Sequence, residues 1–169
     1  MKKLTVCIFI LILILSLSLA GCESDLNEPA NFYYPRKSDT IHFGTSDGLI
    51  TMEPREVAGH SGDLRYILSL YLLGPLDSDL DSPFPDGTTL EDIDVAAGIL
   101  TITLSSSFSQ LSGMDLTIAS ACLSSTCFEL IDVAQVTILS PETELHSQVE
   151  ITLDRNSLTL LDTLPLTTE

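Results

Sequence analysis

The chain has 169 residues, with 24 aspartate and glutamate residues against seven lysine and arginine residues, a formal net charge of −17 at pH 7. This balance argues against nucleic-acid binding, since basic side chains on phosphates supply most of that affinity, and equally against electrostatic docking to anionic lipid headgroups. It favours basic partners or divalent cations instead, and the length suffices for one domain with its own core.

The first 21 residues have the pattern of a secretory signal. Lys2 and Lys3 are followed by an almost wholly apolar run from Leu4 to Leu19. A bilayer-spanning helix needs about 20 apolar residues, so the run is marginal as a span, and small residues follow it. The alternative is an uncleaved anchor helix.

Leu19-Ala20-Gly21-Cys22 resembles a lipobox, the processing signal of bacterial lipoproteins. The resemblance implies that the Cys22 thiol receives a diacylglyceryl group and that the chain is cut just before it. Two or more acyl chains anchor a protein stably, whereas one binds only marginally. We therefore expect a mature protein held by lipid at the extracytoplasmic face of the cell membrane.

Processing changes the charge and the cysteine count. Without its two N-terminal lysines the mature chain has five basic and 24 acidic residues, a formal charge of −19, and Cys7 leaves with the signal. Cys122 and Cys127 remain beside the lipidated Cys22. On one helix their spacing of five residues places them about 140° apart, too far around the axis to pair. We expect two small buried residues, with a disulfide as the alternative.

The mature chain begins with residues 22–38, a segment with prolines and charges but no helical or strand period, which predicts a tether. Two β-rich runs, Thr40–Phe43 and Leu49–Glu53, flank Asp47-Gly48 and predict a hairpin. The apolar spacing from Leu64 to Leu72 then predicts an amphipathic helix, with Asp63 as N-cap and Gly74-Pro75 as its end.

Strands and a helix are also predicted in the second half of the chain. Strands are predicted at Thr89–Val95 and Ile99–Leu104, a helix at Met114–Leu130, a strand at Val133–Leu139, and a terminal hairpin at Gln148–Leu153 and Ser157–Leu161. In Ile99–Leu104 the face with Leu100, Ile102 and Leu104 is predicted to be buried.

This order predicts an α+β fold with two helices packed on one face of a mixed or antiparallel sheet. The expected organisation is a signal (1–21), a lipidated tether (22–38), one domain (39–161) and a tail (162–169).

Three segments together resemble the sporulation and spore germination (GerMN) domain family: "YILSLYLLGP", "SPFPDGTTLEDIDVAAGILTITLSSSF" and "IASACLSSTCFELIDVAQVTIL". The match covers roughly Ser38 to Leu139. It departs from the family pattern at Ile131-Asp132, where Pro-Gly is frequent, and in the turn that follows. The matching positions are Gly74, Pro75, Pro85, Gly87, Thr88, Gly98, Ser106, Phe108, Thr126, Val133 and Val136.

The resemblance implies exported or membrane-tethered modules of Gram-positive envelopes, similar to the ring-building modules of secretion channels. It implies no enzymatic activity and no cofactor, and its motif residues are structural by type. A protein partner or self-association is expected, through the outward residues of the helix Asp63–Leu73 and the strand faces.

Three groups of side chains are candidates for a metal site or a catalytic site. Asp77, Asp79, Asp81 and Asp86 suggest calcium, but Ser82 and Thr88 stand where an EF-hand loop needs glycine and glutamate. His42, His60 and His146 lack the spacing of metal ligands. Glu91, Asp92 and Asp94 are the candidate carboxylates of a glycosidase, in a chain without tryptophan. The sequence predicts no metal site and no catalytic residues.

The expected function is a non-catalytic interaction or assembly module of a membrane complex, of the kind used in sporulation or spore germination. A module that binds the cell-wall polymer peptidoglycan is the main alternative, and a wall hydrolase is the third.

Overall fold

The computed structural model describes residues 29–37, 48–57 and 59–158. The lipobox, the predicted strand Thr40–Phe43 with His42, and the C-terminal tail lie outside the described residues.

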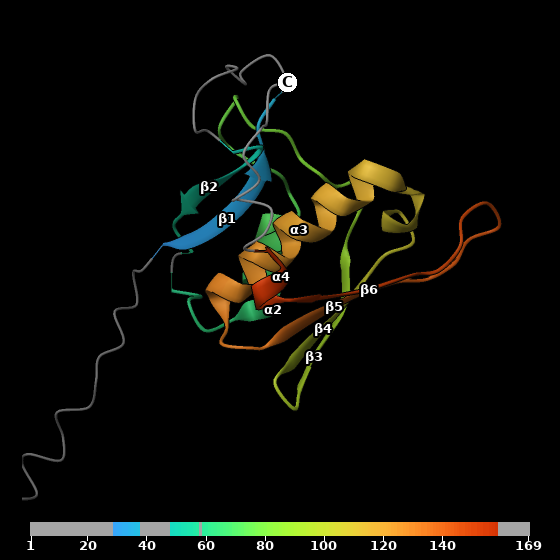
Figure 1. Cartoon of the computed structure of the whole chain (residues 1–169). Coiled ribbons are helices and arrows are strands. Elements are labelled where there is room, and N and C mark those ends of the chain that lie inside the picture. Colours follow the sequence, from blue (N-terminus) through green and yellow to red (C-terminus); the bar gives the residue numbers. More distant parts are fainter. Residues whose placement is uncertain (1–28, 38–47, 58, 159–169) are drawn as a thin grey trace, which may run out of the picture.

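Two sheets form the framework (Figure 1). The larger contains β3 (Leu90–Ala96), β4 (Ile99–Leu104), β5 (Gln135–Ser140) and β6 (Val149–Asp154) in that order. β4 and β5 are parallel, and the outer pairs are antiparallel. The smaller sheet pairs β1 (Ala30–Pro35) with β2 (Ile50–Arg55) in antiparallel register.

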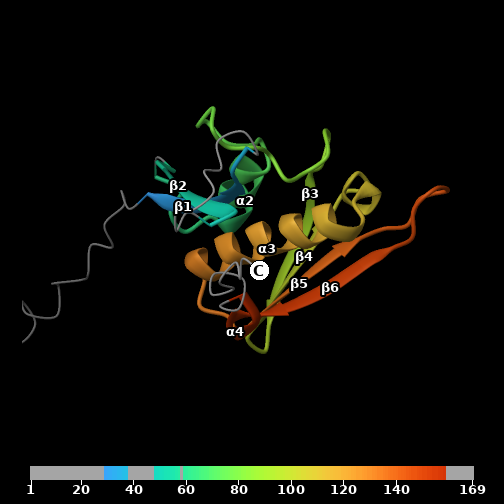
Figure 2. The same cartoon turned by 45° about the horizontal axis from the view of Figure 1, so that its top comes forward.

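The main helices of the described residues are α2 (Leu64–Tyr71) and α3 (Gly113–Leu130). A 3₁₀ turn at Phe108–Gln110 and the short α4 (Arg155–Leu158) are also present. Figure 2 shows α3 between the four-stranded sheet and a layer formed by β1, β2 and α2. The α+β class with two helices and a mixed sheet is confirmed. Its layering differs from the prediction, because the small second sheet gives α3 a β-layer on each side.

The composition of α3 suits this central position. Its buried residues lie all around the axis and include several small ones (Ala119, Ser120, Ala121, Cys122, Leu123, Ser124, Thr126, Cys127 and Phe128). A helix that is buried on all sides needs no polar face, and small side chains allow both layers to approach it.

Local signals in the sequence explain the other elements. The Asp63 carboxylate accepts a hydrogen bond from the Tyr66 amide at 3.0 Å and so caps α2 as predicted. Ala97 and Gly98 both have positive φ, as a two-residue hairpin turn between β3 and β4 requires. Leu100 and its two same-face neighbours on β4 are fully buried against α3, as predicted.

Two predictions of local structure were wrong. The segment expected to be tether contains β1, because Ala30, Phe32 and Tyr34 alternate into the core while the strand pairs with β2. The hairpin strand predicted from Ser157 starts instead as helix α4. The Arg155 amide donates to Ala134 O, just before β5, and the chain leaves the sheet at this point as α4 begins.

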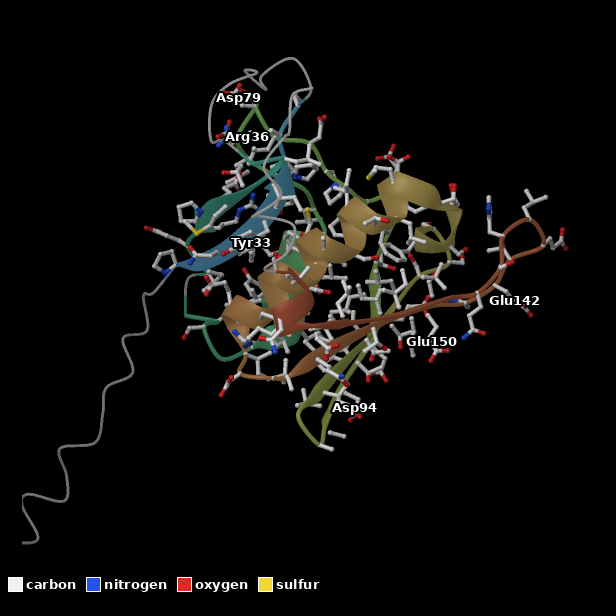
Figure 3. All side chains as sticks on the ribbon, viewed as in Figure 1. Tyr33, Arg36, Asp79, Asp94, Glu142 and Glu150 are labelled. Carbon is white, nitrogen blue, oxygen red and sulfur yellow. The ribbon has the colours of Figure 1, made fainter. Side chains whose placement is uncertain are left out.

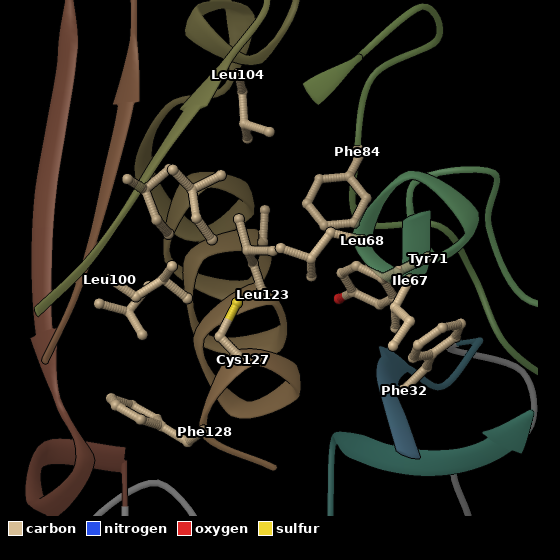
Figure 4. Packing of buried hydrophobic residues seen from close by; sticks show 14 of the residues in the cluster. Phe32, Ile67, Leu68, Tyr71, Phe84, Leu100, Leu104, Leu123, Cys127 and Phe128 are labelled. Atoms are coloured by element: carbon tan, nitrogen blue, oxygen red, sulfur yellow. The ribbon is translucent and has the colours of Figure 1, made fainter. Parts of the chain in front are cut away.

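The core is continuous across α3 (Figure 4). Leu123 and Cys127 lie between the aliphatic side chains of β4 and the ring cluster of Phe32, Tyr71 and Phe84. Cys122 and Cys127 are buried and free, as expected. Within the described ranges, no helix has the length and apolarity needed to cross a bilayer.

Hydrogen bonds tie the small layer to the helices. The Tyr33 amide donates to Thr126 Oγ1 of α3 at 3.0 Å, and Thr126 is fully buried. The Tyr34 hydroxyl donates to Tyr71 O and the Tyr71 hydroxyl donates to Tyr33 O, both at 2.8 Å. Each tyrosine thus joins β1 and α2 at a buried position.

We expect Thr126→Val to lower the free energy of unfolding by about 1–3 kcal/mol, because valine cannot accept the hydrogen bond from the Tyr33 amide. Thr117→Val on the exposed face of α3 is the matched control and should change stability by less than about 0.5 kcal/mol. Urea unfolding followed by circular dichroism measures both. Equal losses in the two variants would contradict a joining role for Thr126.

Burial raises the pKa of the Cys122 thiol to about 12 and also raises the pKa of Cys127. The thiolate is the reactive form, so neither residue should react with iodoacetamide at pH 8 until guanidinium unfolds the chain; peptide mass spectrometry reads the sites. An unfolded thiol ionises near pH 9.0, before the folded one. The free energy of unfolding should therefore fall as pH rises above about 9. Rapid native labelling of either cysteine would contradict their burial.

Candidate interaction surface

The residues of the family pattern build turns and core. Gly74, Gly87 and Gly98 have positive φ at three turns, and Thr88 Oγ1 donates to Pro85 O at 2.8 Å. Pro75 follows Gly74 directly, and the remaining positions lie in the core or beside it (Ser106, Phe108, Thr126, Val133 and Val136). These residues explain why the chain folds as it does, and the exposed surface carries other side chains.

We define the 73–81 corner as Leu73 to Asp81, the segment that follows α2. The Leu73 and Gly74 amides donate to Leu70 O and Tyr71 O, which closes the last turn of the helix. Gly74 has φ of +91°, and a Cβ there would lie 3.6 Å from Ser82 Cβ. The left-handed conformation favours glycine, and it turns the chain sharply away from α2.

A buried ion pair on β2 holds the first half of the corner. Arg55 donates to Glu53 Oε1 and to Gly74 O, the latter at 3.1 Å. Glu53 Oε2 accepts hydrogen bonds from the Leu76 and Asp77 amides, both at 2.9 Å. The Arg55 guanidinium also lies over the Phe32 ring, 5.2 Å from its centroid.

The end of β1 holds the second half of the corner. The Lys37 amide donates to Asp79 O at 3.0 Å and the Asp81 amide to Pro35 O at 2.9 Å. Lys37 Nζ donates to Ser78 O at 2.6 Å. Leu80, in an antiparallel bridge with Arg36, is buried in the core. The corner is thus fixed at both ends on the small sheet.

This fixed loop presents two large apolar side chains to solvent. Leu73 and Leu76 are each 80% exposed, and their Cα atoms lie within about 11 Å because three peptide units separate them. Asp77, Asp79 and Asp81 are exposed beside them. In Figure 3, Asp79 lies at the end of the domain away from Asp94 and Glu150.

The energetics indicate that the ion pair determines conformation more than stability. Desolvation of two charges largely cancels their attraction, while hydrogen bonds to the charges fix the geometry. Here Leu76, Asp77 and Gly74 supply those bonds through backbone atoms. A segment whose backbone groups are bonded and whose leucines are exposed is a suitable contact surface for another molecule.

The open face of the four-stranded sheet lies opposite α3. Thr101, Thr137 and Thr152 are register partners across β4, β5 and β6, and the hydroxyls of the last two lie 3.0 Å apart. Asp94 and Glu150 are exposed near the two edges of the sheet (Figure 3). This face is polar and acidic, and it lacks the large exposed leucines of the corner.

A hollow of about 460 Å³ lies between β2 and the second half of α3. Glu129 accepts from the Tyr33 hydroxyl at 3.2 Å. Arg155 donates to Val133 O and covers the Phe128 ring at 5.0 Å. The charged side chains of the hollow are therefore bonded within the domain.

The structure also places the candidates for other chemistry. Asp77 Oδ1 accepts from the Asp79 amide at 2.9 Å, which is a turn contact, and Asp92 pairs with Arg65 at 3.2 Å. His60 stacks on Tyr66 with ring centroids 3.9 Å apart. Asp81, Asp86, Glu91 and Asp94 are exposed, and His146 is half-buried. In the part of the chain that the structure describes, no three His, Cys, Asp or Glu residues are grouped to hold a metal ion.

The sequence predicted part of the exposed contact surface around α2 and the 73–81 corner, and it did not predict the rest. Leu73 lies at the end of the predicted helical contact surface, but Arg65 and Tyr66 on that helix have partners within the domain. The aspartates of the corner were considered only as a candidate calcium site. The anchor of the corner was missed, although Glu53 and Arg55 alternate along a strand as side chains of one face do.

We expect Glu53→Gln and Arg55→Met each to cost about 3–5 kcal/mol of unfolding free energy, since each leaves a buried partner uncompensated. The double variant should lose clearly less than the sum of the two. Asp92→Asn breaks the exposed pair with Arg65 and serves as control, with a loss below about 1 kcal/mol. Urea unfolding measures the cycle, and additive or small losses at the buried pair would contradict its role.

The comparisons with known proteins agree with this fold. The Germane family model, described as sporulation and spore germination, matches residues 31–146. The tandem GerMN domains of the sporulation protein GerM from Bacillus subtilis are similar at a TM-score of 0.54 and 15% identity, covering 82% of this chain and 49% of that one. This chain therefore spans about half the length of the tandem protein.

A second similar structure is a Clostridium perfringens chain provisionally described as a lipoprotein, with 18% identity, a TM-score of 0.38, and coverage of 80% of this chain and 92% of that one. No curated protein matches the sequence significantly. The family model covers more than half of the chain and agrees with the resemblance drawn from the motifs. The chain belongs to the sporulation and spore germination family.

Proposed function

We propose that this chain is a lipoprotein of the extracytoplasmic membrane face that acts as a non-catalytic interaction module of a cell-envelope complex in spore formation or germination. Family membership supports the process, and Leu19 to Cys22 supports the anchor. The observation that carries the interaction role is the 73–81 corner, a fixed loop with two leucines 80% exposed.

The chemistry of the ionisable groups also supports contact over catalysis. Among the described residues, the groups with shifted pKa are in the core: burial raises the pKa of Tyr34, Tyr71, Cys122 and Cys127. Activation of a nucleophile requires the opposite, a lowered pKa, and the raised pKa makes the reactive ionised forms of these hydroxyls and thiols still rarer at pH 7. The two tyrosines use their hydroxyls to join β1 to α2.

The position of β1 sets the reach of the domain above the membrane. Only seven residues separate Cys22 from Ala30, where β1 begins. At about 3.5 Å per residue, the start of β1 lies at most about 30 Å from the lipidated cysteine. This short reach favours partners whose contacting surface lies close to the bilayer.

Cys22→Ser tests the anchor. We expect the variant to lose its acyl chains and to leave the membrane fraction for the soluble or secreted fraction, because no lipid holds it. Fractionation and intact-mass measurement of the protein expressed in its host provide the readout. Cys7→Ser is the matched control and should keep both the lipid mass and the membrane location. An unprocessed Cys22→Ser protein that stays in the membrane would indicate an uncleaved anchor helix instead.

Native electrophoresis of detergent-solubilised membranes tests the interaction role. The wild-type protein should migrate in a complex larger than the monomer. Migration as a monomer, together with co-sedimentation on purified peptidoglycan sacculi, would replace this proposal with the wall-binding alternative.

A further inference from the structure

We infer that the 73–81 corner docks a positively charged segment of a partner protein, whose apolar side chains contact Leu73 and Leu76. The inference rests on the proposed function and names the surface through which it is exerted. It combines two independent features of the corner, the exposed leucines and the acidic side chains next to them.

The acidic side of the corner is available for a cation. Asp77 and Asp81 are exposed, and within the described ranges neither has an ion-pair partner. The nearby Lys37 uses its ammonium group on Ser78 O. A basic segment would therefore meet carboxylates on a loop whose shape is already fixed, which reduces the entropy lost on binding.

A second copy of this chain does not provide the complementary charge. Each copy has a net charge of −17 before processing. Three of its four arginines are in ion pairs: Arg55 with Glu53, Arg65 with Asp92, and Arg155 with Asp132. The fourth, Arg36, donates to Thr51 Oγ1 of β2 at 3.2 Å. Two corners brought together would repel each other.

The remaining parts of the chain do not provide it either. Residues 38–47 and 159–169 each contain two acidic residues and no lysine or arginine. Lys2 and Lys3 lie in the signal segment that the proposed processing removes, and residues 22–28 contain acidic but no basic residues. Anionic lipid headgroups are repelled for the same electrostatic reason. Charge complementarity therefore selects a different, basic protein.

Site-specific photo-cross-linking in native membranes tests this inference. The full-length protein would carry a photoreactive benzoylphenylalanine in place of Leu76, and in a second strain in place of Leu145, an exposed leucine in another loop. We expect position 76 to cross-link one protein, within a segment of net positive charge that also has apolar residues. Position 145 should give no such product.

Charge variants show whether the acidic side chains contribute. Asp77→Asn/Asp81→Asn, combined with the probe at position 76, should reduce the product about tenfold, as should raised salt. Asp94→Asn/Glu150→Asn on the distant sheet face should leave it unchanged. Equal loss in both pairs of variants would overturn a specific role for the corner.

Other cross-linked products would also overturn the inference. The corner would have a different occupant if the probe cross-linked to another part of the same chain, to a second copy, to lipid or to an acidic protein segment. Capture of a partner only from position 145 would leave the assembly function standing while the corner inference fails. No protein captured from either position, together with monomeric migration on native gels, would remove both.

Discussion

The ion pair between Glu53 and Arg55 determines the path of the chain after α2. The cost of burying two charges falls with each hydrogen bond that they make, and in this pair Arg55 Nε is a buried donor without one among the described residues. Backbone atoms of the corner supply hydrogen bonds to the pair, through the Leu76 and Asp77 amides and the Gly74 carbonyl. The bonds that lower the cost of the buried pair therefore also fix the loop. Leu76, whose amide is one of the bonded groups, is 80% exposed on this fixed backbone.

The central helix connects this corner to the rest of the domain. Small residues let α3 contact the four-stranded sheet on one side and the small sheet on the other. Thr126 bonds β1 to the helix, and the Tyr34 and Tyr71 hydroxyls bond β1 to α2. The ion pair on β2 then bonds to the backbone of the 73–81 corner at the surface. The backbone of the exposed 73–81 corner is therefore connected by hydrogen bonds to strands that pack in the core.

The sequence predicted elements whose signals are local and missed those that depend on distant contacts. α2 was predicted with its cap because Asp63 and the apolar spacing lie within one helix. β1 was missed because its burial comes from pairing with β2 and contact with α3, both distant in sequence. The family motif identified the fold but not the surface, since its residues form turns and core. The pairing of Glu53 with Arg55 was missed because their hydrogen-bond partners, Gly74, Leu76 and Asp77, are about 20 residues further along the chain.

Amide hydrogen exchange at Leu76 and Asp77 tests most directly whether the ion pair fixes the corner. The account predicts that these two amides exchange slowly in the native protein, as slowly as amides of the adjoining strand β2, and that Glu53→Gln speeds their exchange without affecting the amides of β4. Exchange at the rate of an open loop in the native protein, or no change in the variant, would contradict it.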